Sequence, residues 1–153
     1  MEANKHTYTS AATALLQKLI ATPSFSKEED ATASILFDYL NNNGVKPNRH
    51  FNNVWAANKH FDPVKPTILL NSHHDTVKPN AGYTIDPYNA IIRDGKLYGL
   101  GSNDAGASLV SLLHVFLHYY TWENLAYNII FAGTSEEEIS GKNGIESLIP
   151  ELP

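Results

Sequence analysis

The fold is decided by the stretch Thr67-Ile68-Leu69-Leu70-Asn71-Ser72-His73-His74-Asp75-Thr76-Val77. Its apolar first half, residues 67–71, is typical of a buried strand, and the run ends abruptly at two histidines and an aspartate. Side chains alternate between the faces of an extended backbone, so His73 and Asp75 should point one way and His74 the other. Open α/β sheets place their chemistry at the carboxyl ends of strands. A metal ligand at His73, with its ring oriented by Asp75, would suit this position.

A His-x-Asp pair by itself is more often a hydrogen-bonded surface or core pair, so the metal hypothesis depends on two acidic motifs downstream. Asp104 lies in a glycine-flanked turn before a helical segment, and Glu136-Glu137-Glu138 follows a second apolar run. The carboxyl ends of parallel strands share one edge of a sheet, so these clusters could meet despite their separation. The triplet alone would be interpreted as a solvated acidic run favoured by a helix dipole.

Composition restricts the chemistry of such a site. The chain has 153 residues, enough for one domain with a core, and a net charge of −5 that does not suggest nucleic acid or an anionic membrane as partner. There are no cysteines, which excludes disulfides, thiol catalysis and thiolate zinc sites. A metal would therefore need His, Asp and Glu ligands. No apolar signal segment or membrane-length run is present, and the cytoplasm is the predicted location.

The remaining elements follow from periodicity and breakers. Ser26-Lys27-Glu28-Glu29 matches a capping box. The passage from residue 78 to 96 is a long, turn-rich segment of the kind that often carries function. We expect helices over residues 10–20, 27–41 and 105–120 and a short last helix after Gly144. We expect strands over residues 67–71 and 128–134, and an edge hairpin formed by strands over residues 45–50 and 53–59.

His114 and His118 are spaced i, i+4 on the best predicted helix and could bind a metal. The three residues between them are Val-Phe-Leu, without the carboxylate of a His-Glu-x-x-His motif. We therefore interpret them as a packed or solvent-facing pair.

The three motifs at residues 72–77, 97–104 and 134–138, in this order and spacing, carry a family resemblance. They resemble the acetylornithine deacetylase/succinyl-diaminopimelate desuccinylase family of co-catalytic zinc hydrolases, a group that includes aminoacylases, dipeptidases and carboxypeptidases. Residues 21–26 and 94–99 resemble it as well, so the likeness covers essentially the whole chain. It implies an α/β fold with a mixed, mostly parallel sheet flanked by helices, the catalytic domain of a zinc peptidase-like hydrolase.

The resemblance assigns a role to each residue of the site. His73 would bind one of two zinc ions, Asp104 would bridge both, and Glu138 would bind the other, with cobalt as a possible substitute for zinc. Glu137 would be the general base, and Asp75 would orient His73.

One part of this alignment is ambiguous, because the acidic triplet also permits a register in which Glu136 is the base and Glu137 the ligand. We favour the first register because Thr134 and Ser135 then align with the family. The resemblance also implies a cis peptide bond between Asp104 and Ala105.

Two departures from the family pattern carry consequences. Asp104-Ala105-Gly106-Ala107 lacks a lysine that the family usually has after the bridging aspartate, so the charge near the substrate should differ. The family's chain is also much longer and supplies further ligands, a carboxylate and a late histidine. We therefore expect residues 1–153 to be the N-terminal portion of the catalytic domain, with the lid or dimerisation domain and the C-terminal catalytic segment absent. Alone it should bind zinc poorly, turn over little and expose sheet surface.

The resemblance implies zinc-dependent hydrolysis of the amide bond of a small-molecule N-acyl amino acid, by a cytoplasmic protein that could be a homodimer at full length. N-acetylornithine, or another N-acylornithine, in arginine biosynthesis is the first substrate we expect. The alternatives are a dipeptidase, a carboxypeptidase or a succinyl-diaminopimelate desuccinylase of the same family. A hypothesis of another class is a non-catalytic binding protein on the same fold.

Overall fold

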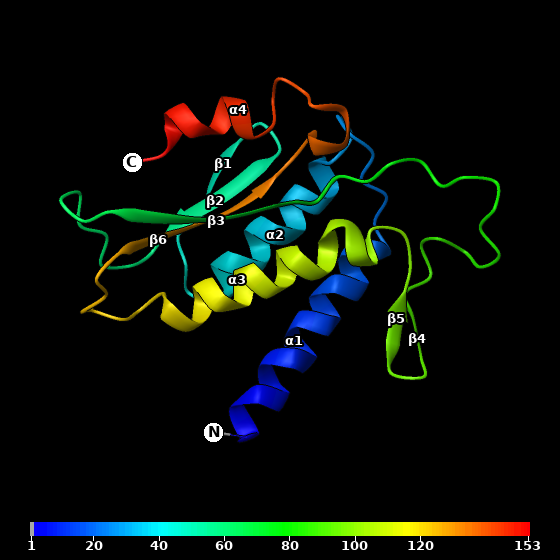
Figure 1. The fold of residues 1–153 in the computed structure, drawn as a ribbon, viewed down its shortest axis with the longest axis horizontal. Helices are drawn as coiled ribbons and strands as arrows, with labels where there is room; N and C mark the ends of the chain where they lie inside the picture. Colours follow the sequence, from blue (N-terminus) through cyan, green and yellow to red (C-terminus); the bar gives the residue numbers. More distant parts are fainter. Residues whose placement is uncertain (1) are drawn as a thin grey trace.

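Two strands that are far apart in sequence lie side by side in the main sheet (Figure 1). The computed structural model describes residues 2–153, with side chains from residue 8 onward. The helices are α1 (Glu2–Ile20), α2 (Asp30–Asn42), η1 (Ser102–Gly106), α3 (Ala107–Tyr119), η2 (Glu137–Ile139), α4 (Ile145–Leu148) and η3 (Ile149–Glu151). The strands are β1 (Asn48–His50), β2 (Asn53–Ala57), β3 (Thr67–His73), β4 (Ile91–Arg93), β5 (Lys96–Tyr98) and β6 (Asn128–Thr134).

The main sheet has the strand order β1-β2-β6-β3. Strands β3 and β6 run parallel, in register from Thr67 opposite Asn128 to His73 opposite Thr134. The β1–β2 hairpin is antiparallel and pairs with β6 in the antiparallel direction. The predicted mixed α/β sheet and its edge hairpin are confirmed. The mostly parallel character is not seen among the described strands, because a short hairpin can only return antiparallel.

Helices α1, α2 and α3 lie on one side of the sheet, and the short α4 lies on the other (Figure 1). The core between sheet and helices is apolar and fully packed at its centre, with Leu36 from α2, Leu113 and Phe116 from α3, and Phe131 from β6 all at 0% exposure. Burial of such side chains supplies about 1.5–3 kcal/mol each. The core thus fixes the sheet on which the strand ends are presented.

The helix expected over residues 27–41 begins later, at Asp30, and the capping-box prediction is wrong. No side chain caps the start of α2, and Lys27 has a left-handed backbone with φ of 76°. The Ser26 hydroxyl donates instead to Asp75, and the Glu29 carboxylate accepts from partners outside the first turn. Tertiary hydrogen bonds have replaced the local ones that the spacing suggested.

Other boundaries shift modestly. The first helix starts well before residue 10, the strand at residue 67 extends to His73, and the segment 78–96 contains β4 of a small β4–β5 hairpin that projects from the molecule (Figure 1). In the described part of the chain, none of the helices is both long and apolar enough to cross a bilayer.

Candidate metal centre

The carboxyl ends of β3 and β6 bring the predicted site residues together. His73 is the last residue of β3, and its register partner Thr134 is the last of β6. The chain then runs from Thr134 into the loop that holds Glu136, Glu137 and Glu138. Two motifs separated by more than sixty residues therefore meet because parallel strands end at one edge.

His73, Asp104 and Glu138 each offer one ligand atom, and these three atoms lie within 4.8 Å of one another. The ring Nε2 of His73 is 3.2 Å from Oδ1 of Asp104 and 3.6 Å from Oε2 of Glu137. His73 itself is buried, whereas Asp104 is exposed and Glu138 is half-buried. The cluster therefore combines a buried imidazole with carboxylates that are accessible to solvent.

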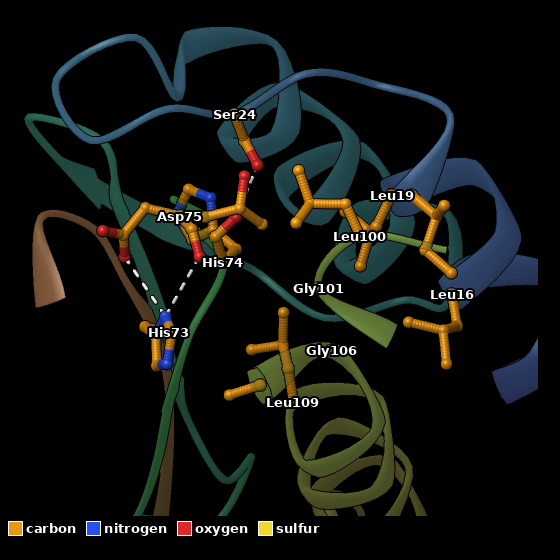
Figure 2. A pocket seen from close by; sticks show the side chains of 13 residues that line it. Leu16, Leu19, Ser24, His73, His74, Asp75, Leu100, Gly101, Gly106 and Leu109 are labelled. Carbon is orange, nitrogen blue, oxygen red and sulfur yellow. Dashed lines mark hydrogen bonds and ion pairs between the residues drawn. The ribbon is translucent and has the colours of Figure 1, made fainter. Parts of the chain in front are cut away.

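Asp75 lies beside the Nδ1 edge of the His73 imidazole (Figure 2). Asp104 is on the opposite, Nε2 side of the ring. Oδ1 of Asp75 is 3.3 Å from Nδ1 of His73, and the backbone carbonyl of Asp75 lies 3.1 Å from the same nitrogen. A ring with Nδ1 so occupied presents Nε2 to the cluster. Asp75 therefore contacts the ring nitrogen opposite the one that faces the cluster.

The carboxylate of Asp75 also makes contacts that the sequence did not predict. It accepts hydrogen bonds from the backbone N–H groups of Glu137 and Glu138, both at 3.1 Å, and from the Ser26 hydroxyl at 2.7 Å. Burial alone would raise the pKa of Asp75, but the bonds from His73, Ser26 and the two amides lower it to about 2. Asp75 therefore ties the His73 strand to the acidic loop as an anion.

Within the acidic triplet, the three side chains have separate positions. Glu136 is buried and turns away from His73, so that its carboxylate accepts from the side-chain amide of Asn143 at 2.9 Å. Glu137 lies beside His73, and Glu138 joins the three-residue cluster. Glu137 and Glu138, rather than Glu136, are thus the members of the triplet next to His73 and Asp104.

Asp104 is presented by the irregular turn η1, directly before α3. The peptide bond between Asp104 and Ala105 is cis, as predicted. Gly106 closes the turn where a side chain would not fit, because a Cβ there would lie 2.6 Å from the carbonyl oxygen of Gly101. The turn seats Asp104 opposite His73 at the start of the helix.

The charge balance of the cluster favours a cation. Burial, followed by the charge of Asp104, raises the pKa of Glu138. The hydrogen bond from His73 to Asp75 raises the pKa of the His73 imidazole to about 9, against burial, which lowers it. Within the described residues, no lysine or arginine forms an ion pair with Asp104, Glu137 or Glu138. A divalent ion would relieve the repulsion between these carboxylates.

Sequence reasoning missed the buried residues that support the acidic loop from the α2 side. Glu29 is fully buried and accepts from the backbone N–H of Glu136 at 3.1 Å. His74 is buried between the Thr32 hydroxyl and the carbonyl of Asn52, both at 2.9 Å from the ring nitrogens. Burial lowers the pKa of His74. The sequence had predicted that His74 points away from His73. For Glu29, the only available signal was its spacing from Ser26, which matched a capping box instead.

His114 and His118 do not join the site, in agreement with the packed-pair interpretation. His114 is buried, with Nε2 2.9 Å from the Tyr39 hydroxyl and Nδ1 2.8 Å from the carbonyl of Val110. His118 makes edge contacts with the rings of Tyr8 and Tyr119.

Two open grooves adjoin the cluster. One runs past His73 and Glu137 and is lined by polar groups that include Ser72, Ser108 and Glu146. The other lies on the Asp104 and Glu138 side and includes Tyr83. A third, small cavity lies on the inner side of Asp75 among leucines (Figure 2). The open grooves, rather than this inner cavity, have the size and polarity for a polar substrate.

The donor set fits a divalent metal ion. One imidazole nitrogen and two carboxylate oxygens converge, and a buried carboxylate is bonded to the back of the imidazole. Nitrogen and oxygen donors of this kind are standard zinc ligands, and the ligating histidine usually has such a partner.

The fold and the site together define a class of protein: an α/β domain with a His/Asp/Glu group at the carboxyl ends of two parallel strands. Residues 69–152 match the model of Peptidase family M20/M25/M40. The chain belongs to this family.

Individual relatives agree with this assignment. The chain is 30% identical over 148 residues to the succinyl-diaminopimelate desuccinylase of Blochmanniella floridana, covering 90% of this chain and 38% of that protein. It is 32% identical over 151 residues to the protein of the same name from Blochmanniella pennsylvanica, covering 94% and 39%. The crystal structure of the M20 family metallo-carboxypeptidase Sso-CP2 from Sulfolobus solfataricus superposes with a TM-score of 0.71 at 25% identity, over 84% of this chain and 31% of that one. The chain thus spans about two fifths of the length of the curated relatives it matches.

Proposed function

We propose that this chain contributes the N-terminal part of the catalytic domain of a metal-dependent amidohydrolase that cleaves the amide bond of a small N-acyl amino acid. The observation that carries the proposal is the convergence of His73, Asp104 and Glu138 within 4.8 Å, with Asp75 bonded behind His73 and Glu137 beside it. Family membership supports the same chemistry.

His73, Asp104 and Glu138 would hold the metal, which when bound would supply Lewis-acid polarisation of the scissile carbonyl and activation of the attacking water. Glu137 would accept the proton of that water and return it to the leaving amine. It is exposed and has a carboxylate oxygen 3.6 Å from His73, so it can reach both the centre and a substrate in the adjoining groove. Asp75 would keep the His73 ring in place.

Two zinc ions, with Asp104 shared between them, are part of this proposal. The exposure of the Asp104 side chain, 77%, supports a bridging role because it leaves room beyond the oxygen that faces His73. Since a zinc site needs at least three protein ligands, the two-metal form requires ligands besides those grouped here. We propose that they come from outside residues 1–153, together with the lid or dimerisation domain.

Two substrates compete. The names of the two desuccinylase relatives support N-succinyl-diaminopimelate, and hence lysine rather than arginine biosynthesis. N-acetylornithine, expected from the family resemblance, remains the second candidate. Both are N-acylated amino acids whose amide would meet the same centre, and they differ in the acyl group and the distal ammonium or carboxylate.

The deciding experiment is amide hydrolysis by the protein expressed from its complete gene and loaded with zinc. N-succinyl-diaminopimelate, N-acetylornithine, N-succinylornithine and a simple dipeptide are offered in parallel, with Glu137→Ala as the inactive control. Preference for one acylated amino acid, abolished in the control while zinc stays bound, is the expected result.

The other outcomes separate the alternatives. Cleavage of the dipeptide alone would keep the mechanism and overturn the substrate class. Full zinc occupancy with no hydrolysis of any of the four would favour a non-catalytic binding protein on this fold. The cytoplasmic location and the homodimer belong to the same proposal, and size-exclusion chromatography of this protein tests the dimer.

A further inference from the structure

Three consecutive backbone N–H groups of the acidic loop are held by two buried carboxylates. The N–H of Glu136 donates to Oε1 of Glu29, the N–H of Glu137 donates to Oδ1 of Asp75, and the N–H of Glu138 donates to Oδ2 of Asp75, each at 3.1 Å. Glu29 and Asp75 are both at 0% exposure. Glu29 lies 107 residues before Glu136 in the chain, so this contact exists only in the folded protein.

The loop has little structure of its own to fix it. Its helix η2 has only three residues, and the residues on either side of it, Glu136 and Ser140, have left-handed φ angles of 56° and 49°. Left-handed conformations are unfavourable for residues other than glycine and persist where surrounding contacts hold them. The position of the Glu137 and Glu138 side chains therefore depends on the tertiary contacts that hold the backbone of residues 136–138, and the one at Glu136 comes from Glu29.

The Glu29 carboxylate is occupied on both oxygens. Oε1 accepts from the N–H of Lys27 at 2.7 Å as well as from Glu136, and Oε2 accepts from the side-chain amide of Asn52 at 2.9 Å. Such full pairing is what a buried carboxylate requires. Lys27 has a φ of 76°, so Glu29 joins two left-handed backbone segments, one before α2 and one after β6.

We propose that Glu29 is a positioning residue that fixes the backbone of Glu136 and thereby aims Glu137 and Glu138 at His73 and Asp104. This inference rests on the proposed function, because it concerns the same centre. Glu29 touches neither the ligand atoms nor the grooves and acts through one backbone amide. A displacement of about 1 Å in a catalytic group can lower a rate by about a hundredfold, so this single amide bond matters for the chemistry.

The test compares three variants in the protein expressed from its complete gene. Glu29→Gln keeps a carbonyl oxygen for the Glu136 amide, Glu29→Leu removes it at similar volume, and Glu29→Asp draws it back by one methylene. Leu40→Val, a fully buried change on the same helix and away from the loop, is the control for a general loss of stability.

Three readouts are needed. Zinc affinity is measured by chelator competition, kcat and KM on the preferred substrate are measured separately, and amide hydrogen exchange of a peptide covering residues 133–140 is followed in the metal-free protein. We expect Glu29→Leu and Glu29→Asp to weaken zinc binding about tenfold or more. They should also lower kcat more than they change KM and speed exchange in this peptide. Glu29→Gln keeps an acceptor for the Glu136 amide but sets its NH2 group opposite the Asn52 amide, so its losses should be clearly smaller, and Leu40→Val should stay near the wild type.

Two results would overturn the proposal. Equal losses of zinc affinity and kcat in Glu29→Gln and Glu29→Leu would mean that the charge of Glu29, and not its contact with the Glu136 amide, matters. Losses in Leu40→Val as large as those in Glu29→Leu would mean a general loss of stability. If Glu29→Leu does not fold, Glu29→Asp against Glu29→Gln gives the same decision. Failure of the proposed function looks different, because zinc would then bind without hydrolysis, and the affinity and exchange series would still decide the role of Glu29.

Discussion

Asp75 lies directly behind His73, with its Oδ1 3.3 Å from the ring Nδ1, and the same carboxylate receives the backbone amides of Glu137 and Glu138. One buried side chain therefore sets both the imidazole and the loop that faces it. A carboxylate at the back of a metal-binding histidine normally raises the basicity of the ligand and fixes its ring. Here it also fixes the position of the acidic residues across the centre.

We expect Asp75→Asn to weaken metal binding by about 10- to 100-fold, because an amide cannot accept from all four of the donors that Asp75 serves. An unsatisfied donor left in the interior should also lower the free energy of unfolding by about 1–3 kcal/mol. Chelator competition and urea unfolding measure the two effects. The matched control is Asp38→Asn on the exposed face of α2, and equal metal affinity in both variants would contradict the orienting role.

Metal affinity should rise with pH up to about 9, the raised pKa of His73 in the metal-free protein. The affinity rises with pH in this range because the pKa of His73 is raised. Below that pH the imidazole holds a proton that a metal must displace, so the affinity should increase by about tenfold per pH unit in the approach to the pKa. Isothermal titration calorimetry at pH 7.5 in buffers of different ionisation enthalpy should show release of about one proton. A pH-independent affinity between 6.5 and 9 would count against His73 as a ligand.

The same pair has a stability window in the metal-free protein. The contribution of His73 is fully present below its ordinary pKa of about 6.5 and is lost as pH rises through about 9, since its pKa is raised on folding. The contribution of Asp75 is present above its ordinary pKa of 3.8 and is lost as pH falls toward about 2, since its pKa is lowered. We therefore expect chemical denaturation to show the greatest benefit of the pair between about pH 4 and 6.5, and Asp75→Asn to remove that benefit.

Acid should destabilise the fold through His74. Burial lowers its pKa, so the unfolded chain takes up a proton below about pH 6.5 that the folded chain does not, and stability falls as pH decreases. The slope for one such group approaches about 1.4 kcal/mol per pH unit. Urea unfolding between pH 6.5 and 5 should show a shallower slope in His74→Gln than in the wild type, with His60→Gln, at a turn before β3, as the control. Parallel slopes in all three proteins would refute this assignment.

The three glutamates of the acidic loop should give three different phenotypes. Glu137→Gln should keep the metal and lower kcat by about 10²- to 10⁴-fold, as loss of a general base does. Glu138→Gln should lose metal affinity, since its carboxylate belongs to the cluster, and Glu136→Gln should retain turnover within about tenfold, because its carboxylate faces Asn143. Metal analysis and steady-state kinetics distinguish the variants. Loss of turnover in Glu136→Gln with metal retained would instead support the other register.

The sequence alone determined the chemistry-bearing residues and the elements that present them. Alternation along residues 67–75 separated His73 and Asp75 from His74, and the apolar runs at residues 67–71 and 128–134 became the two parallel strands β3 and β6. These features are local, because strand alternation and apolar periodicity depend on neighbouring residues only. For the same reason the carboxyl-end placement of His73 and of the acidic triplet could be predicted.

Only the tertiary structure decided how those residues are supported. Ser26 and Glu29 have the spacing of a helix cap, yet their side chains bind Asp75 and the backbone of Glu136, 49 and 107 residues away. The separate positions of Glu136, Glu137 and Glu138 likewise come from Asn143, Asp75 and Glu29. Buried donors and acceptors must be paired. Which pairs form depends on how the strands pair and how α2 packs against the sheet, and no local sequence pattern encodes that.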